Sequence, residues 1–550
     1  MTVKGDAEAV RIKGNVICNS MKCDKVEGGV AMKENLMVDN MAFRSFSSDD
    51  WRTRLPQPIC EDVPDYDKLY QKAWELSYDH IRYIDGMPQS PYMDEAFCDT
   101  QLWIWDTCFM ALFCKYAGDD FPGVESLRNF YEVLYEGKSF PSIIPSEREP
   151  EWTGATPGVP FQIQIQIADN PPLFAFAEYE NALFSGDVSY IRDLLYNKGV
   201  LQKHYDWIEN LKESVLPSGV AAPTRLIAEE LGYKWEGGRS GMDNTPRGKT
   251  QARELKARPN NPNMLWIDAI CQQALSARII SKMFAIVGDD DNSFEWNCRY
   301  NEKKDIVNRY YWDDTDQFYY DIDINDHHFY KVMTPASYWA LISEIATEER
   351  AHGMVLRLFD EETLGGEVPL KSLAKNDPDY DKRGRYWRGG LWLPTAYAAL
   401  KGLEKYGYYD EARDLSIKIL NHMLRTYTEY EPHTIWEAYA PEFSAPATVV
   451  EGNGDVMQDF CGWSALGPIS LFIENVIGFH SVNAFEKVVK WQKPVEFKKA
   501  LGIKNLRFAD VVTDIVAVGN ECSVKSNKPY RLEINGKAFQ IFAGEQTISL

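Results

Sequence analysis

Two short segments, each holding one carboxylate among aromatic or polar neighbours, could together perform acid–base chemistry. They are Ser240–Asn244, which contains Asp243, and Thr434–Tyr439, which contains Glu437. The run Tyr386–Trp392, which has an arginine between two tryptophans, lies between them in the sequence. Cleavage of a glycosidic bond requires two such carboxyl groups, one protonated to supply a proton and one ionised to activate water. We therefore interpret Asp243 and Glu437 as a candidate acid and base.

The segment around Asp243 is predicted to be a loop. Residues 233–247 contain several glycines and a proline, which are unfavourable inside a helix. Loops held by a rigid scaffold commonly carry function. The run Asp243–Pro246 is also good turn chemistry, so a turn or helix cap is the structural alternative for this aspartate. The local sequence does not separate the two interpretations.

Glu437 lies in a denser group of carboxylates and aromatic residues. Glu442 follows it closely and is a second candidate for the base, while Trp436 and Tyr439 could instead be core residues. The run Tyr386–Trp392 could likewise be packing before a helix. An arginine between tryptophans with glycine beside it also suits a wall on which a pyranose ring stacks while its hydroxyls are hydrogen-bonded.

Composition favours an ordinary globular protein and argues against nucleic-acid and membrane partners. The chain has 550 residues, 45% of them hydrophobic, which is enough to bury a large core without metals or disulfides. Lys and Arg number 59 against 82 Asp and Glu, so the net charge of −23 repels phosphate backbones. No apolar run is long enough to span a bilayer, and no secretory signal is visible at the start. We expect a cytoplasmic protein; the alternative is a periplasmic one whose signal peptide was removed.

The ten cysteines are predicted to be mostly buried free thiols. No two of them form a Cys-x-x-Cys pair. Cys108 and Cys114 lie among Phe, Leu and Ala, where a thiol behaves as a small core residue. Cys98 belongs to the same cluster in the sequence. This pattern mildly favours a reducing compartment.

The hydrophobic pattern divides the chain into three parts. Residues 1–60 show short apolar runs broken by Gly and Asn, and residues 485–550 alternate as strands do, with an Asn535-Gly536 hairpin signal. Residues 61–484 instead show helical periodicity, as in Ala412, Leu415, Ile419, Met423 and Tyr427.

Within the helical part, helical stretches end at Gly118, Gly186, Gly288 and Gly407, as glycine just past a helix C-terminus does. The spacing of these glycines is irregular, which argues against a strict solenoid. We predict a mainly α fold, an (α/α)6 barrel with its loops at one mouth. A β-rich segment precedes this barrel and a small antiparallel β module follows it.

Four motifs in one order resemble glycoside hydrolase family 63 and its relatives, the family 37 trehalases and the mannosylglycerate hydrolases. They are Trp103–Phe109, Ser240–Asn244, Tyr386–Gly389 and Trp436–Tyr439, and the resemblance spans about Tyr66 to Phe479. It implies an (α/α)6 barrel and an inverting mechanism on α-glycosidic bonds, usually those of α-glucose. The substrate would be a small oligosaccharide or glycoside.

The resemblance also implies roles for particular residues. Asp243 matches the general acid of the family and Glu437 its general base. Residues that match motifs lining the sugar site are Trp105, Asp106, Trp387, Arg388 and Trp392. We add three neighbours as expected sugar-binding residues, Arg247, Trp436 and Tyr439.

Two departures from the family pattern bear on the substrate. Gly390 replaces a proline that is frequent in the family, and Ala438 stands where many members have asparagine. Specificity is expected to depend on loops such as Ser139–Gln166. The expected mechanism needs no metal or organic cofactor. The run Asp321–Asp326 has calcium-like spacing but lacks the glycine at its sixth position and a carboxylate at its twelfth, so a structural calcium there is the minor alternative.

Two other classes of function remain as alternatives. A sugar epimerase or isomerase could use a similar barrel, but it would need histidine as the proton carrier, and only His433 lies near a motif. A non-catalytic carbohydrate-binding protein would tolerate loss of both carboxylates. No Gly-x-Ser-x-Gly elbow, His-Glu-x-x-His or Walker loop is present.

Overall fold

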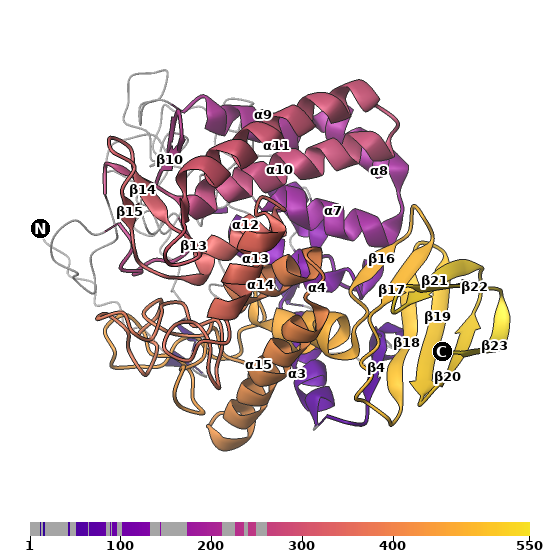
Figure 1. Cartoon of the computed structure of the whole chain (residues 1–550). Coiled ribbons are helices and arrows are strands. Elements are labelled where there is room, and N and C mark those ends of the chain that lie inside the picture. Colours follow the sequence, from indigo (N-terminus) through magenta and orange to yellow (C-terminus); the bar gives the residue numbers. More distant parts are fainter. Residues whose placement is uncertain are drawn as a thin grey trace, which may run out of the picture.

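The computed structural model describes most of the chain from Trp51 onward (Figure 1). The described residues are 51–63, 65–83, 89, 91–95, 102–131, 143–144, 173–211, 226–235, 240–248 and 261–550, with the backbone of the short strands β1 (Arg11–Ile12), β2 (Asn15–Val16) and β3 (Ala42–Phe43). Most of the predicted N-terminal segment, Cys98 and most of the Ser139–Gln166 loop lie outside these residues.

The middle of the chain is helix-rich, as predicted. After α2 (Trp51–Arg54), its helices are α3 (Tyr66–Asp79), α4 (Ile104–Cys114), η1 (Gly118–Asp120), η2 (Val124–Leu127), α5 (Arg128–Tyr131), α7 (Phe174–Ser185), α8 (Val188–Arg192), η3 (Asp193–Lys198), α9 (Val200–Glu209), α10 (Ile267–Ile286), α11 (Asp290–Tyr310), η5 (Pro335–Tyr338), α12 (Trp339–Ile342), α13 (Glu348–Arg357), α14 (Leu393–Lys405), α15 (Tyr409–Glu429), η6 (Ser464–Leu466) and η7 (Gly467–Ile477).

Short strands that the sequence did not predict interrupt the helical part. They are β5 (Ile81–Tyr83), β6 (Tyr92–Met93), β7 (Leu102–Trp103), β8 (Ile143–Ile144), β9 (Ile227–Glu229), β10 (Gly232–Lys234), β11 (Met264–Leu265), β12 (Trp312–Asp313), β13 (Phe318–Tyr319), β14 (Asp321–Asp323) and β15 (Phe329–Tyr330). They pair within small sheets of two or three strands in the connecting segments.

Six helical elements contact one another in a closed order. α4 contacts α7, α7 contacts α10, and the order continues through α12, α14 and η7, which contacts α4 again. Every residue of α4, α12 and η7 is buried. α11, which packs on α10, buries only Trp296, Tyr300, Lys303 and Val307 of its 21 residues. The apolar composition of α4, α12 and η7 thus matches their burial on all sides, and the one-sided hydrophobic pattern of α11 matches its burial on one face.

Local signals at the helix ends and faces agree with the sequence reading. Gly118, Gly186, Gly288 and Gly407 all have positive φ, between 56° and 81°. Gly186 ends α7, where its N–H donates to the carbonyl of Ala182. The α15 stripe Ala412, Leu415, Ile419 and Met423 is buried, and Tyr427 is half-buried against the core.

The C-terminal module consists of two sheets. One has the order β23 (Gly544–Ser549), β20 (Glu521–Ser526), β19 (Val511–Val518), β18 (Leu501–Phe508) and β4 (Gln57–Cys60). The other has the order β16 (Ser481–Asn483), β17 (Val488–Trp491), β21 (Tyr530–Ile534) and β22 (Lys537–Ile541). The Asn535-Gly536 turn joins β21 to β22, with φ of 48° and 80°.

The prediction of a purely antiparallel module is wrong in one pair. β17 and β21 run parallel because the chain builds β18, β19 and β20 between them and returns in the same direction. The first strand, β16, begins at Ser481, slightly before the predicted boundary. β4 shows that a strand from before the helical part completes the first sheet.

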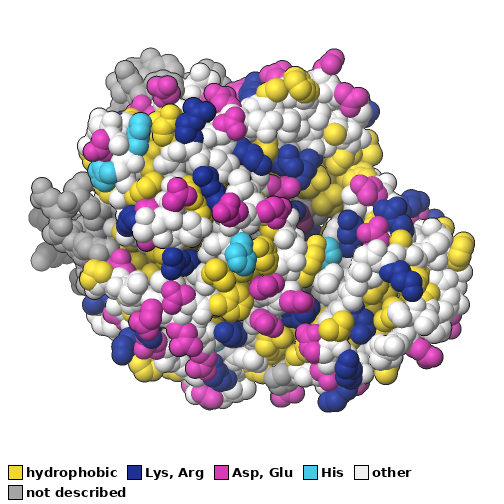
Figure 2. All heavy atoms as spheres, viewed as in Figure 1, with side chains coloured by type: hydrophobic (Ala, Val, Ile, Leu, Met, Phe, Trp, Pro, Cys, Tyr) yellow, Lys and Arg dark blue, Asp and Glu magenta, His cyan; other side chains and the backbone are white. Residues whose placement is uncertain are grey.

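The surface is mixed in character. Figure 2 shows acidic and basic side chains interspersed over one face, with hydrophobic side chains in small groups between them. In the part of the chain that the structure describes, no helix has the length and apolar character needed to cross a bilayer. Of the cysteines described, Cys108, Cys114, Cys271, Cys461 and Cys522 are buried free thiols.

Candidate active site

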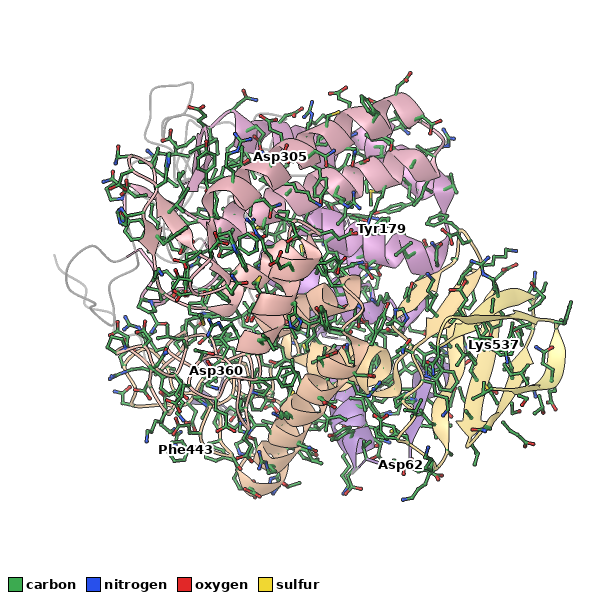
Figure 3. All side chains as sticks on the ribbon, viewed as in Figure 1. Asp62, Tyr179, Asp305, Asp360, Phe443 and Lys537 are labelled. Carbon is green, nitrogen blue, oxygen red and sulfur yellow. The ribbon has the colours of Figure 1, made fainter. Side chains whose placement is uncertain are left out.

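The predicted motifs lie at the starts of two helices and in two connecting segments. Trp105 and Asp106 lie in the first turn of α4, and Trp392 is the N-cap residue of α14. Glu437 lies in the connection between α15 and η6, and Asp243 lies in the loop 240–248, outside any helix or strand as predicted. In Figure 3, Asp360 and Phe443 are labelled on the side of the molecule opposite the β module that carries Lys537.

Glu437 is buried and held at both carboxylate oxygens. Its side chain is 3% exposed. Oε1 accepts a hydrogen bond from the hydroxyl of Tyr386 at 3.0 Å, and Oε2 accepts one from the backbone N–H of Met457 at 3.0 Å. The Glu437 N–H donates to the Met457 carbonyl at 2.9 Å, and its own carbonyl accepts from Trp463 Nε1 at 2.8 Å. These bonds fix both the backbone and the carboxylate.

Burial dominates the electrostatics of Glu437. Loss of solvent raises its pKa to about 7, although the N–H of Met457 and the hydroxyl of Tyr386 act in the opposite direction. The charge of Asp243 also raises this pKa. Asp106 has a pKa raised well above the usual value by burial, and then by the charges of Glu437 and Asp243. Asp106, Asp243 and Glu437 therefore lie near enough to interact, although they are far apart in the sequence.

The loop that carries Asp243 packs directly on the first turn of α4. Gly241 has a φ of +80°, and a Cβ atom at this position would lie 2.8 Å from ring carbons of Trp105. Only glycine combines this backbone conformation with so close an approach. The loop thereby holds Asp243 beside the Trp105 and Asp106 pair.

Asn244 anchors the same loop to the Tyr386–Trp392 run. Its side-chain oxygen accepts from the N–H of Trp387 at 2.8 Å, and its side-chain nitrogen donates to the carbonyl of Arg385 at 3.0 Å. The Asn244 carbonyl accepts from Nε of Arg388 at 2.9 Å. Arg388 is fully buried and pairs with Asp379 at 2.9 Å. Arg388 thus joins two backbone segments of the site.

Arg247 is buried in a bidentate ion-pair network. Its guanidinium donates to both carboxylate oxygens of Asp268, at 2.9 Å each, and to both of Asp321, at 2.8 and 2.9 Å. It also approaches Met242 Sδ at 3.6 Å and covers the ring of Trp266. These contacts use the N–H groups of the guanidinium, so Arg247 holds the Asp243 loop in place. This role differs from the sugar contact predicted from its position in the sequence.

The tryptophans of the predicted sugar wall pack mainly on each other. Trp387 and Trp392 stack with ring centroids 4.1 Å apart, and both are fully buried. Trp436 and Tyr439 are also buried, and the Tyr439 hydroxyl accepts from the N–H of Trp436. Trp105, at 9% exposed, is the most accessible of the predicted tryptophans. The stacked pair therefore forms the support of the site, with Trp105 nearer its surface.

The alternative base and the alternative proton carrier have partners elsewhere. Glu442 pairs with Lys382 at 3.7 Å, and burial and then the charge of Glu442 raise the pKa of Tyr380. His433 is half exposed and pairs with Glu431 at 3.0 Å.

One residue of the calcium-like run Asp321–Asp326 forms an ion pair with an arginine. Asp321 receives the Arg247 guanidinium, while Asp323, Asp326 and His328 place one ligand atom each within 4.8 Å of one another. Asp326 and His328 are exposed, and they pair with each other.

A cavity of about 650 Å³ lies between the C-terminal ends of α4 and α7 and β18, at the opposite end of α4 from Asp106.

Sequence reasoning missed four residues that shape this site. Tyr386, Met457 and Trp463 hold Glu437, and Asn244 joins the two loops. Tyr386 and Asn244 belong to the motifs Tyr386–Gly389 and Ser240–Asn244, so their polar groups were visible signals. Met457 acts through its backbone, and no side-chain pattern could have revealed it.

Comparison with known families agrees with these motifs. The chain is a glycoside hydrolase of the family 63 type, as its motifs predicted. The family described as "Mannosylglycerate hydrolase MGH1-like glycoside hydrolase domain" matches residues 99–460, which is more than half of the chain, so the protein belongs to this family.

Its curated relatives are distant. An uncharacterized protein of Borreliella burgdorferi is 26% identical over 78% of this chain and 83% of its own length. A mannosyl-oligosaccharide glucosidase of Saccharomyces cerevisiae is 23% identical over 58% of this chain, and a mannosylglycerate hydrolase of Rubrobacter radiotolerans is 28% identical over 27% of it. The matches span 43% and 33% of those two enzymes, less than half of their lengths.

Solved structures share the fold. A GH63 mannosylglycerate hydrolase from Thermus thermophilus, in complex with glucose, superposes with a TM-score of 0.52 at 18% identity, over 74% of this chain and 99% of that one. A sialidase superposes with a TM-score of 0.62 at 12% identity, over 90% of this chain and 41% of its own. At these identities the likeness concerns the fold alone.

Proposed function

We propose that this protein is an inverting hydrolase of α-glycosidic bonds, α-glucosidic bonds first, acting on a small oligosaccharide or glycoside. The observation that carries the proposal is the group formed by Asp106, Asp243 and Glu437, three carboxyl groups from distant segments whose charges act on one another. Asp106 and Glu437 are buried, and Asp243 is half-buried. Packing alone would not bring them together, because like charges in a dry region cost free energy.

The scaffold is proposed to be an (α/α)6 barrel. The closed order α4, α7, α10, α12, α14 and η7 would form its inner ring, and α3, α9, α11, α13 and α15 would belong to its outer layer. Burial of every residue in α4, α12 and η7 supports this arrangement, since inner helices of a closed ring have no solvent face. Loops at the starts of the inner helices would then line the mouth.

The hydrogen bonds favour Glu437 as the base. Two closely placed carboxyl groups in a region of low dielectric hold a proton between them more readily than two negative charges. The donors Tyr386 and Met457 both stabilise the ionised form of Glu437. In the proposed reaction Glu437 removes a proton from water as it attacks the anomeric carbon, and Asp243 protonates the leaving oxygen.

Inversion requires room for this water between the two groups. The carboxyl groups of inverting enzymes stand roughly 6.5–9.5 Å apart, against about 5 Å in retaining ones. Trp105 and Asp106 are proposed to contact the sugar, with Trp387, Trp392, Trp436 and Tyr439 as the packed wall behind it. Arg247 and Arg388 fix the loops in place.

No cofactor takes part in this scheme. The cytoplasmic location stays a prediction, since named relatives include both cytosolic and periplasmic trehalases.

A panel of α-linked sugars tests the substrate and the mechanism together. It should include trehalose, mannosylglycerate and glucosylated oligosaccharides, with the first-formed anomer followed by proton NMR. Appearance of the β-anomer before mutarotation supports inversion. Early α-anomer would contradict it, and conversion to an isomer without uptake of water would favour an epimerase instead. Sugar binding without turnover would favour a binding protein.

A further inference from the structure

Tyr386 is placed differently from the other aromatic residues of the site. Trp387, Trp392, Trp436 and Tyr439 are buried, whereas Tyr386 is half-buried. Its hydroxyl donates to Glu437 Oε1 at 3.0 Å. Burial and then the charge of Glu437 raise the pKa of Tyr386 well above its usual value, so the phenol keeps its proton and remains a donor.

The backbone at Tyr386 adopts a conformation that side chains disfavour. Arg385 and Tyr386 have φ of +34° and +63°, in the left-handed region that favours glycine. Such strain persists only where the surroundings over-determine it, and it concentrates at functional sites. The Tyr386 N–H donates to the Thr448 carbonyl at 2.7 Å, its carbonyl accepts from Trp392 Nε1 at 3.1 Å, and its ring meets the Trp392 ring edge-on.

The same backbone is tied to the loop of the proposed acid. Asn244, the residue after Asp243, donates to the carbonyl of Arg385 and accepts from the N–H of Trp387, so it brackets Tyr386 on both sides. The hydrogen bonds of Asn244 and the covalent backbone of residues 385–387 thus connect the Asp243 loop to Tyr386, whose hydroxyl bonds the carboxylate of Glu437.

We infer that Tyr386 is a positioning residue for the hydrolytic base: its hydroxyl orients Glu437 and stabilises the ionised carboxylate, and Asn244 sets where that hydroxyl lies. The inference rests on the proposed function, since it assigns Tyr386 to Glu437 as the base. After burial, the charge of Asp243 raises the pKa of Glu437, and the charge of Glu437 in turn raises the pKa of Asp106. The tyrosine hydroxyl and the Met457 N–H are the contacts that oppose protonation of this glutamate. Removing the hydroxyl leaves the Met457 bond alone against burial and the charge of Asp243.

The Tyr386→Phe variant tests this role. It keeps the ring and removes one donor to a charged carboxylate, which should move the acidic limb of the pH profile of kcat/KM upward by about 1–2 pH units. At pH 7 the rate should fall about 5- to 50-fold, and the deficit should shrink as the pH rises. A purely structural role would lower the rate without moving this limb.

Tyr380→Phe is the matched control. Tyr380 lies in the same segment, but its hydroxyl neighbours Glu442 instead of Glu437. Its removal should leave the acidic limb in place. Equal shifts in both variants, or no shift in Tyr386→Phe, would overturn the inference.

A titration that needs no turnover separates this inference from the proposed function. The carboxyl carbon of Glu437, labelled with ¹³C and assigned by its loss in Glu437→Gln, should titrate at higher pH in Tyr386→Phe than in the wild-type protein. A shifted titration in a protein that hydrolyses no sugar would retain the contact and refute the hydrolase. An unshifted titration in an active hydrolase would refute the role of Tyr386 alone.

A second substitution covers the case in which Tyr386→Phe does not fold. Replacing Tyr386 alone with 3,5-difluorotyrosine keeps the shape of the ring and makes the hydroxyl a stronger donor. The titration of Glu437 should then move to lower pH. Movement in the other direction, or none, would contradict the proposed hydrogen-bond role.

Discussion

The position of the acidic limb of the pH profile follows directly from the burial of Glu437. A base must be ionised to act, so the rate falls as the pH drops through its pKa. Burial raises this pKa from 4.5 to about 7. A single titration then predicts that kcat/KM falls about 25-fold between pH 7.5 and 5.5, whereas an ordinary glutamate would lose only about a tenth over the same range.

The assay is initial-rate hydrolysis of the best substrate from the sugar panel, measured under first-order conditions from pH 4.5 to 9. Under these conditions the limb reports the free enzyme. The Glu437→Gln variant should retain binding, lose about 10²- to 10⁴-fold in rate, and show no acidic limb in its residual activity. An acidic limb with its midpoint near pH 4.5 in the wild-type enzyme, or a limb that persists in Glu437→Gln, would refute the reasoning from burial.

Three further outcomes test other parts of the structure. Gly241→Ala should lower the rate by at least about 10-fold, because the new Cβ would meet Trp105. Gly407 has a φ of +81°, close to the +80° of Gly241, but a Cβ there would lie in open space, so Gly407→Ala carries the same backbone strain and should leave the rate unchanged. Equal activity in the two variants would contradict the packing argument. Arg247→Met should cost about 3–5 kcal/mol of unfolding free energy in urea, because it leaves Asp268 and Asp321 buried without their partner. Lys525→Ala, at the exposed pair with Glu545, should lower the unfolding free energy far less, and similar losses in the two variants would argue against a buried network. Glu437→Gln should gain stability relative to wild type as the pH rises from about 4.5 to 7. The reason is that a carboxyl group whose pKa is raised on folding stabilises the folded state while it is protonated and destabilises it once it is ionised. An equal change of melting temperature with pH in the two proteins would contradict the raised pKa.

Local signals in the sequence predicted much of the fold. Periodicity identified the buried stripe of α15, Asn535-Gly536 identified a hairpin, and glycines marked helix ends. The parallel pairing of β17 with β21 was not predictable in this way, because it depends on which sheet each strand joins after a long excursion of the chain. The short strands in the connections were missed because two or three residues carry no readable period.

The candidate site was predictable by residue type but not by contact. Asp243 and Glu437 could be selected because carboxylates among aromatic residues suit acid–base work. Arg247 was expected to contact the sugar, and the structure gives its guanidinium to Asp268 and Asp321, two partners that its own segment does not reveal. The buried stack of Trp387 on Trp392 was likewise not predictable. The sequence alone does not distinguish a tryptophan that supports the sugar-binding residues from one that contacts the sugar.

The pairing of β4 with β18 has a consequence for how the protein is made. β4 immediately precedes α3, the first long helix, and its partner follows η7, the last helical element. A ribosome therefore releases β4 long before the strand that covers it exists, and the edge of β4 stays open until residues 501–504 emerge. A late step in synthesis thus joins two segments that flank the helical part of the chain. A nascent chain stalled before Leu501 should be far more sensitive to protease at Gln57–Cys60 than one stalled after Phe508.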